Sequence, residues 1–158
     1  MKEFDLYEPM GKWLNEYLKI KYKNYEIIVK DTHSITLDKA LRSLGIENNL
    51  AVGLGIQIDV LGVAKKDNKI KLFFIEAKIT PLTLRDLGQL WAYCKLIDPE
   101  EAFLLSSNSF GTLNKIFNVL AREDLLDFGS AKKIKKMKIG IWDVNRNSPN
   151  SLTMIPHV

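Results

Sequence analysis

The stretch IQIDVLGVAKKDNKIKLFFIEAKI, residues 56–79, contains two apolar, β-branched runs, residues 56–64 and 70–79. A polar segment with the turn formers Asp67 and Asn68 separates them, which predicts a β-hairpin. The second run is apolar at nearly every position, so its far half is expected to be buried on both faces. Such burial is typical of a central strand that is covered by helices.

The segments on either side of this stretch predict a mixed sheet with helices around it. Before the hairpin, apolar spacing predicts a helix over residues 8–21, a strand over 25–30 and a short helix over 37–44 that ends at Gly45. After the hairpin it predicts a helix over 82–97, a strand over 102–106, a helix over 110–128 and a strand over 138–144. The 158 residues show no internal repeat and no interdomain linker. We therefore expect a single α/β domain over residues 1–158, a mixed β-sheet flanked by helices.

The composition limits the classes of partner and metal. A net charge of +4 favours a polyanionic partner such as nucleic acid. Cys94 is the only cysteine and the chain has two histidines, so a multi-cysteine zinc site is excluded and a catalytic metal would need carboxylate ligands. Acidic residues near the N-terminus and the lack of a long apolar run predict an intracellular, cytoplasmic protein with no membrane partner.

Glu76 and Lys78 are the only charges in the second half of the buried run, where an unpaired charge would cost several kcal/mol. Alternation along a strand puts both on one face, while Ala77 points the other way and leaves its carbonyl free as a ligand. If the turn is centred between Asp67 and Asn68, Asp59 lies opposite Glu76, with the β-carbons roughly 5 Å apart. Two carboxylates this close repel unless a cation such as Mg²⁺ or Mn²⁺ lies between them. A slip of one residue in register would move one carboxylate to the other face.

The sequence Ile-Gln-Ile-Asp59, a short hairpin and then Phe-Ile-Glu76-Ala77-Lys78 resembles the PD-(D/E)XK nuclease superfamily, with Gln57 or Ile58 in the place of proline. The expected order of elements also resembles the restriction-endonuclease-like αβββαβ core of that family. The resemblance implies that Asp59, Glu76 and the Ala77 carbonyl bind Mg²⁺ or Mn²⁺. It also implies that Lys78 orients the attacking water and offsets charge on the phosphorane.

The helix after the hairpin adds a second resemblance. Arg85, Gln89 and Tyr93 recur every four residues, away from an apolar arc formed by Leu84, Leu87, Leu90, Trp91, Cys94 and Ile97. Gln89-Leu-Trp-Ala-Tyr93 resembles the Q-x-x-x-Y element of RecB-type nucleases, which lies beside the site. The resemblance implies that Arg85, Gln89 and Tyr93 position substrate. The alternative is that Gln89 and Tyr93 form a surface pair.

Glu8 lies near the start of the first predicted helix, in a position that resembles the extra acidic metal ligand of archaeal Holliday junction resolvases. The alternative is a first-turn acid that the helix dipole favours. His33 is expected to be a loop histidine rather than a base.

A basic run follows the last predicted helix and contains Lys132, Lys133, Lys135 and Lys136. It is interpreted either as a nucleic-acid-binding patch that contacts phosphates or as a solvated turn.

Together these features predict a metal-dependent nuclease that hydrolyses phosphodiester bonds in DNA, as an endonuclease. One alternative is a non-catalytic nucleic-acid-binding protein that retains a nuclease-like fold. Another is a structural protein in which Glu76 and Lys78 form an ordinary ion pair. A homodimer is expected only by the resemblance, and the substrate structure stays open.

Overall fold

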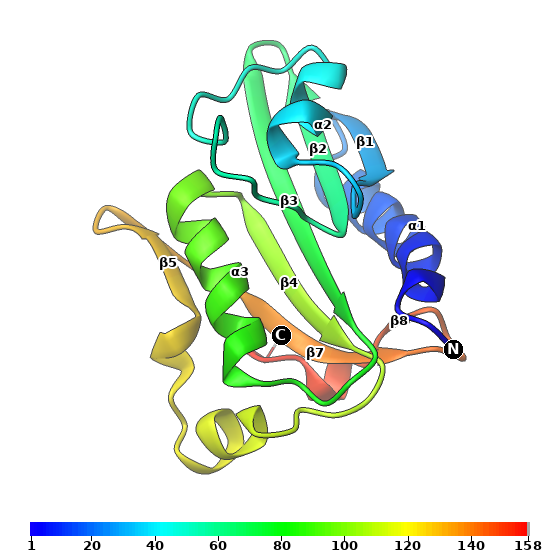
Figure 1. The fold of residues 1–158 in the computed structure, drawn as a ribbon, viewed down its shortest axis with the longest axis vertical. Coiled ribbons are helices and arrows are strands. Elements are labelled where there is room, and N and C mark those ends of the chain that lie inside the picture. The colour runs from blue at the N-terminus through cyan, green and yellow to red at the C-terminus, as the bar shows by residue number, and fades with distance from the viewer. Residues whose placement is uncertain (158) are drawn as a thin grey trace.

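The computed structural model describes residues 1–157, and in this part of the chain a six-stranded sheet has the strand order β1-β2-β3-β4-β7-β8 (Figure 1). The strands are β1 Glu26–Asp31, β2 Val60–Lys66, β3 Lys69–Lys78, β4 Glu101–Ser106, β7 Lys138–Asp143 and β8 Ser148–Pro149. Strands β1, β2 and β3 are antiparallel neighbours, β3, β4 and β7 run parallel, and β8 is antiparallel to β7. The predicted mixed sheet is therefore confirmed.

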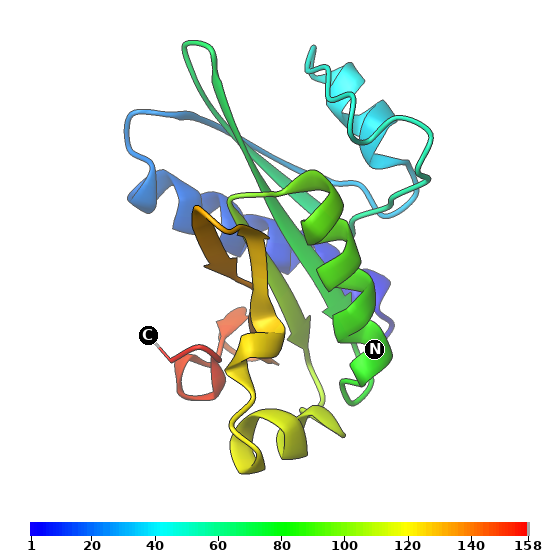
Figure 2. The same ribbon diagram turned by 90° about the vertical axis from the view of Figure 1, so that its left-hand side faces the viewer.

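Helices α1 (Phe4–Lys21) and α3 (Leu84–Ile97) cover opposite faces of this sheet (Figure 1 and Figure 2). The alternation of β3 explains both contacts, because successive side chains point to opposite faces. Phe73, Ile75 and Ala77 belong to the core cluster that includes the buried residues of α1. Leu72 and Phe74 belong to the cluster under α3. Glu76 and Lys78 continue the second set, so they lie on the α3 face.

The helix termini differ from the sequence expectation in informative ways. Helix α1 begins one turn early, because the amides of Asp5 and Leu6 already bond the carbonyls of Lys2 and Glu3, and Pro9 consequently lies inside the helix. Helix α3 begins two residues late, at a capping box in which Thr83 and Asp86 bond each other's amides. None of the helices in residues 1–157 is both long and apolar enough to cross a membrane.

The segment between β1 and β2 packs over the α3 face. It contains the short helix α2 (Leu37–Ser43), whose N-cap Thr36 accepts a bond from the amide of Lys39. Ile56 and Ile58 are buried in the same cluster. They precede the sheet rather than open it, because the carbonyl of Ile56 bonds the amide of Leu37. Strand β2 therefore starts at Val60, later than predicted.

The helix predicted over residues 110–128 is wrong. This region contains a π-helical turn at Lys115–Val119, a 3-10 turn at Glu123–Leu126 and the first strand of a separate hairpin, β5 Asp127–Ser130 with β6 Lys133–Lys136. Positive φ angles at Gly111 (52°) and Ala121 (54°) interrupt any continuous α-helix. A β-carbon on Gly111 would lie 2.4 Å from the carbonyl oxygen of Leu82, so the close approach of these two backbones requires glycine.

Candidate active site

The register of the β2–β3 hairpin brings Asp59 beside Glu76. The ladder runs from Lys66 opposite Lys69 to Val60 opposite Ile75, and Asp67 in the turn has a φ of 54°. Asp59 is the next residue before Val60, and Glu76 is the next after Ile75. The register predicted from the turn is therefore confirmed.

Each of the two carboxylates is held by the backbone of the opposite strand. The amide of Ala77 donates to Asp59 Oδ2 at 2.9 Å, and the amide of Asp59 lies 3.4 Å from Glu76 Oε1. Glu76 is buried, with 7% of its surface exposed, and Asp59 is partly buried. These contacts fix two acidic side chains side by side at the end of the hairpin.

Both carboxyl groups favour the protonated form more than ordinary ones do. Burial raises the pKa of Glu76 well above its usual value, the charge of Asp59 raises it further, and Lys78 offsets only part of this. Burial also raises the pKa of Asp59, against the opposing effects of the Ala77 amide and Lys78. The protein's own groups therefore leave negative charge at this point without full compensation.

Lys78 forms its ion pair with Asp86 of α3 rather than with Glu76. Its Nζ lies 3.9 Å from Oδ1 of Asp86, the third residue of that helix. The carbonyl of Lys78 accepts the amide of Ser107, which follows β4. Because carbonyls alternate sides along a strand, the carbonyl of Ala77 points toward the opposite neighbour, the side on which Asp59 lies.

Glu3 is an acid near the site that the sequence reasoning missed. Burial raises the pKa of Glu3, Lys78 lowers it, and the charges of Asp59 and Asp86 raise it. Glu3 therefore lies within electrostatic reach of these three groups. The signal in the sequence would have been a helix start at Phe4, which places residue 3 rather than residue 8 at the helix N-terminus.

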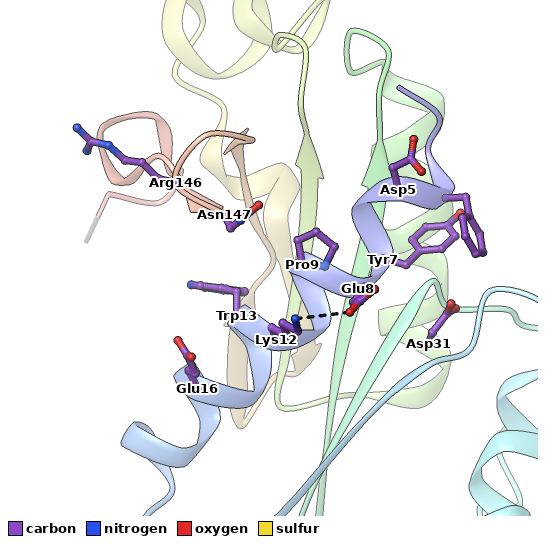
Figure 3. Close-up of a pocket in the computed structure, with 11 residues that line it drawn as sticks. Asp5, Tyr7, Glu8, Pro9, Lys12, Trp13, Glu16, Asp31, Arg146 and Asn147 are labelled. Carbon is purple, nitrogen blue, oxygen red and sulfur yellow. Dashed lines mark ion pairs between the residues drawn. The ribbon is translucent and has the colours of Figure 1, made fainter.

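The structure does not bring Glu8 to the carboxylate pair. Its side chain is 82% exposed and forms an ion pair with Lys12 at 3.5 Å (Figure 3). It lines a pocket of about 590 Å³ together with residues such as Trp13 and Arg146. Among residues 1–157, no three His, Cys, Asp or Glu side chains converge into a group that could hold a metal. Asp59 and Glu76 therefore form a pair of carboxylates outside any larger acidic cluster, with Glu3 within electrostatic reach.

The end of β1 forms a second border of the site. The amide of Thr32 donates to the carbonyl of Asp59 at 3.0 Å. The next residue, His33, has Nδ1 2.5 Å from Oδ1 of Asp31, and its ring stacks on Tyr7 with centroids 4.8 Å apart. His33 is a loop histidine, as expected, but its ring is held in a fixed orientation. The spacing Asp31-x-His33 was the signal that could have shown this.

The side of α3 that reaches Lys78 also carries the Q-x-x-x-Y residues. Asp86, Gln89 and Tyr93 follow one another at spacings of three and four residues and therefore share one side of the helix. Gln89 Nε2 donates to the Tyr93 hydroxyl at 3.1 Å. Arg85 is exposed, as is Gln89, whereas Tyr93 is half-buried against the core.

The apolar arc predicted for α3 is too wide. Leu87, Leu90, Cys94 and Ile97 are buried, but Leu84 is 55% exposed and Trp91 is 40% exposed. The indole of Trp91 donates to the carbonyl of Asp127 at 2.9 Å. The side of α3 away from Asp86 therefore faces the β5–β6 hairpin and is only partly covered.

The predicted lysine patch lies on and beside β6, and most of its charge is paired within the chain. Lys133 lies 3.7 Å from Glu100, Lys135 lies 2.8 Å from Asp98, and Lys136 lies 2.5 Å from Asp127. Lys135 also donates to the carbonyl of Pro99, and its side chain is only 15% exposed. Lys132 and Lys133 are exposed at the hairpin. Lys135 and Lys136 therefore have a mainly structural role.

No protein-family model, curated protein or solved structure matches the chain. The geometry and chemistry of the residues around Asp59 and Glu76 therefore carry the functional argument.

Proposed function

We propose that this chain is a metal-dependent nuclease that hydrolyses phosphodiester bonds in DNA as an endonuclease. The observation that carries the proposal is the pair Asp59 and Glu76, two adjoining carboxylates with raised pKa values beside Lys78. A protein stabilises such a pair poorly by itself, because neighbouring like charges repel. A divalent cation would remove this penalty.

The donor set fits a hard ion such as Mg²⁺ or Mn²⁺. Asp59 and Glu76 would supply carboxylate oxygens, and Ala77 would supply its carbonyl, which points to the same side as Asp59. Glu3 is a candidate for a further acid, in the role that the sequence suggested for Glu8. When bound, such an ion would acidify a water molecule and supply positive charge to the phosphoryl group.

Lys78 would act on the charge that develops during hydrolysis. Its ammonium group shares the α3 face with Glu76 and is held near the N-terminus of α3 by Asp86. A cation in this position stabilises the negative charge of a pentacoordinate phosphorane. Asp86 would orient Lys78, and Gln89 and Tyr93 on the same side of α3 would bind the nucleic-acid backbone.

The order of elements also supports the proposal. Helix α1, strands β1, β2 and β3, helix α3 and strand β4 occur in the order αβββαβ once the short helix α2 between β1 and β2 is set aside, and β3 and β4 are parallel. We propose that these elements form the core that the resemblance to PD-(D/E)XK nucleases implies. The homodimer expected from that resemblance stays a prediction.

The alternatives receive less support. In the ordinary ion-pair alternative, Lys78 would neutralise Glu76, but the acid paired with Lys78 is Asp86. A nucleic-acid-binding protein that does not cut would leave the raised pKa values of Asp59 and Glu76 without a purpose. Binding without cleavage is therefore the second candidate function, and its charges would include the exposed Lys132 and Lys133.

Cleavage assays test the proposal directly. The wild-type protein is incubated with plasmid, duplex, junction and single-stranded DNA, and with RNA, in Mg²⁺, Mn²⁺ or chelator. We expect metal-dependent cleavage that Asp59→Ala, Glu76→Ala and Lys78→Ala each reduce by at least about 100-fold. The matched control is Glu26→Ala, because Glu26 is an exposed acid at the end of β1 away from the site. This variant should cut normally.

Two results would contradict the proposal. One is the absence of metal-dependent cleavage on every substrate, and the other is wild-type cleavage by two of the three variants. Salt-sensitive binding in the absence of cleavage would favour the non-catalytic alternative.

A further inference from the structure

An aromatic cluster of Phe4, Tyr7 and His33 lies between the start of α1 and the end of β1, and the proposed hydrolysis does not use it. Tyr7 and His33 stack with their planes 29° apart. The ring of Phe4 lies edge-on to both, 5.5 Å from His33 and 5.9 Å from Tyr7. Tyr7 is buried, but Phe4 is 62% exposed. The cluster thus presents an apolar aromatic surface to solvent.

The His33 ring is held in place before any ligand binds. Oδ1 of Asp31 accepts bonds from both the backbone amide of His33, at 3.1 Å, and the ring Nδ1, at 2.5 Å. Tyr7 covers one face of the ring, and the His33 side chain remains 33% exposed. A ring that is already oriented loses little conformational entropy when a flat partner stacks on it.

The cluster borders the carboxylate site on two sides. His33 follows Thr32, whose amide bonds the carbonyl of Asp59 and whose hydroxyl bonds the carbonyl of Ile58. Phe4 follows Glu3, which lies within electrostatic reach of Asp59 and Lys78. A nucleotide whose phosphate reaches Asp59 would therefore have its base near these rings.

The surrounding charge indicates which part of a nucleotide the cluster would contact. Glu3, Asp5 and Asp31 lie in or beside the cluster and would repel a phosphate group. A neutral, planar base experiences no such repulsion and can stack on aromatic rings. Bases within a duplex already stack on each other, so a protein ring gains access only to an unpaired base.

We propose that Phe4 and His33 form a stacking platform for an unpaired base next to the scissile phosphate, which assigns single-stranded, flap or junction nucleic acid as the substrate class. This inference rests on the proposed nuclease function. Phe4 and His33 would be substrate-binding residues that orient the strand, and they take no part in the hydrolysis itself.

Fluorescence of 2-aminopurine tests the stacking without relying on cleavage. The base analogue is placed at successive positions of a single-stranded oligonucleotide and of the matching duplex, and Ca²⁺ replaces Mg²⁺. We expect a several-fold loss of fluorescence at one or two adjacent positions of the single strand and no change in the duplex. Phe4→Leu should abolish this loss and weaken binding about tenfold, equivalent to about 1.4 kcal/mol. His33→Gln should act in the same direction.

The control is Tyr25→Leu, a half-buried aromatic residue just before β1, at the end of that strand away from Asp31. It should bind and quench as the wild type does. The platform is rejected if no position is quenched, or if Phe4→Leu quenches as strongly as the wild type. Quenching without metal-dependent cleavage would support the platform and reject the nuclease. Cleavage of fully paired duplex that Phe4→Leu leaves unchanged would support the nuclease and reject the platform.

Discussion

Glu76 occupies a position that stability alone would give to an apolar residue. It is buried next to Asp59 in a strand whose neighbouring residues are otherwise apolar, and its partners leave its pKa raised. An uncompensated buried charge lowers the free energy of unfolding. Such a residue is retained where its chemistry is needed, and this supports a functional role for the pair.

Glu76→Gln should therefore stabilise the metal-free protein at neutral pH, by about 1–3 kcal/mol. A folded-state pKa above the ordinary 4.5 means that the folded protein binds more protons than the unfolded chain does. The contribution of Glu76 to the stability of the wild type is consequently fully present below pH 4.5 and is lost as the pH rises through the raised pKa of the folded state. The glutamine side chain does not ionise, so the variant should lose less stability over this window.

Urea unfolding in chelator, at a series of pH values, measures this effect. Glu26→Gln, at an exposed acid, is the control and should follow the wild-type curve. Saturating Mg²⁺ should raise the stability of the wild type more than that of Glu76→Gln, because binding to the folded state adds to the free energy of unfolding. A variant that is less stable than the wild type in chelator at neutral pH would contradict the prediction.

Among the individual residues of the candidate site, the sequence predicted the Asp59–Glu76 pair. It did not predict the position of Glu3 near that pair or the orientation of His33. The pair follows from two local rules, the two-residue turn and the alternation of side chains along a strand. Glu3 depends on the first turn of α1, and His33 depends on the packing of α1 against the end of β1. The stacking of His33 on Tyr7 and the approach of Glu3 to Asp59 join segments far apart in the sequence, so the local signals at Phe4 and Asp31 do not show them by themselves.

Helix α3 has two unlike sides. Asp86 reaches Lys78 at the end of β3, and Gln89 and Tyr93 share that side of the helix, whereas Leu84 and Trp91 lie on the side of the β5–β6 hairpin. The sequence predicted the helix and its polar line, because a period of 3.6 residues is a local property. It could not distinguish Leu84 and Trp91 from core residues, because that depends on how far the β5–β6 hairpin covers them.

Gln89→Ala and Tyr93→Phe should raise KM for DNA cleavage about tenfold each, since each loses a hydrogen-bonding group on the substrate side. The kcat value, the metal dependence and the unfolding temperature should change little. Gly88→Ala is the matched control on the other side of α3, because its added β-carbon meets nothing within 4 Å. It should cut with the wild-type KM and gain about 0.5–1 kcal/mol of stability from the better helix propensity of alanine.

Steady-state cleavage kinetics and thermal unfolding distinguish these effects. An unchanged KM in both Gln89→Ala and Tyr93→Phe would reduce the Q-x-x-x-Y resemblance to a surface pair. The Arg85→Ala variant tests the remaining member of the predicted set, because Arg85 is exposed and lies one turn before Gln89. We expect this substitution to raise KM as well.

A second buried acid, Glu101, connects α1 to the sheet, at the end of the sheet opposite the candidate site. Glu101 opens β4, three residues before Leu104, which lies opposite Glu76. It accepts a bond from the hydroxyl of Tyr17 at 2.6 Å and pairs with Lys138 of β7 and with Lys21 at 3.2 Å. Burial would raise the pKa of Glu101, but these partners outweigh burial and hold the pKa below its ordinary value.

Glu76 and Glu101 show why the sequence could predict the architecture better than the contacts that stabilise it. The mixed sheet follows from the periods and order of the elements, which lie within short windows. Glu101 bonds Tyr17, which is 84 positions away along the chain, and Lys138, which is 37 positions away. No pattern near residue 101 indicates these contacts. The β5–β6 hairpin was missed because the chain leaves helical geometry through positive φ angles at Ala121, before the hairpin, and at Gly129, inside β5.

Lys138→Met should therefore destabilise the protein without damaging the site. Removal of one partner leaves Glu101 buried with less compensation, and we expect a loss of about 2–4 kcal/mol at neutral pH. In the wild type, the contribution of Glu101 is present above the ordinary carboxyl pKa of 4.5 and is lost as the pH falls through the lowered pKa of the folded state. The difference between the wild type and Lys138→Met should consequently shrink as the pH falls below that value. Urea unfolding over this pH range measures the difference in stability, with the exposed Lys132→Met as the control.

Because the network lies at the other end of the sheet from Asp59 and Glu76, kcat should stay at the wild-type value at temperatures where the variant is folded. A fall in kcat without a fall in stability would show instead that the Glu101 network acts on the site.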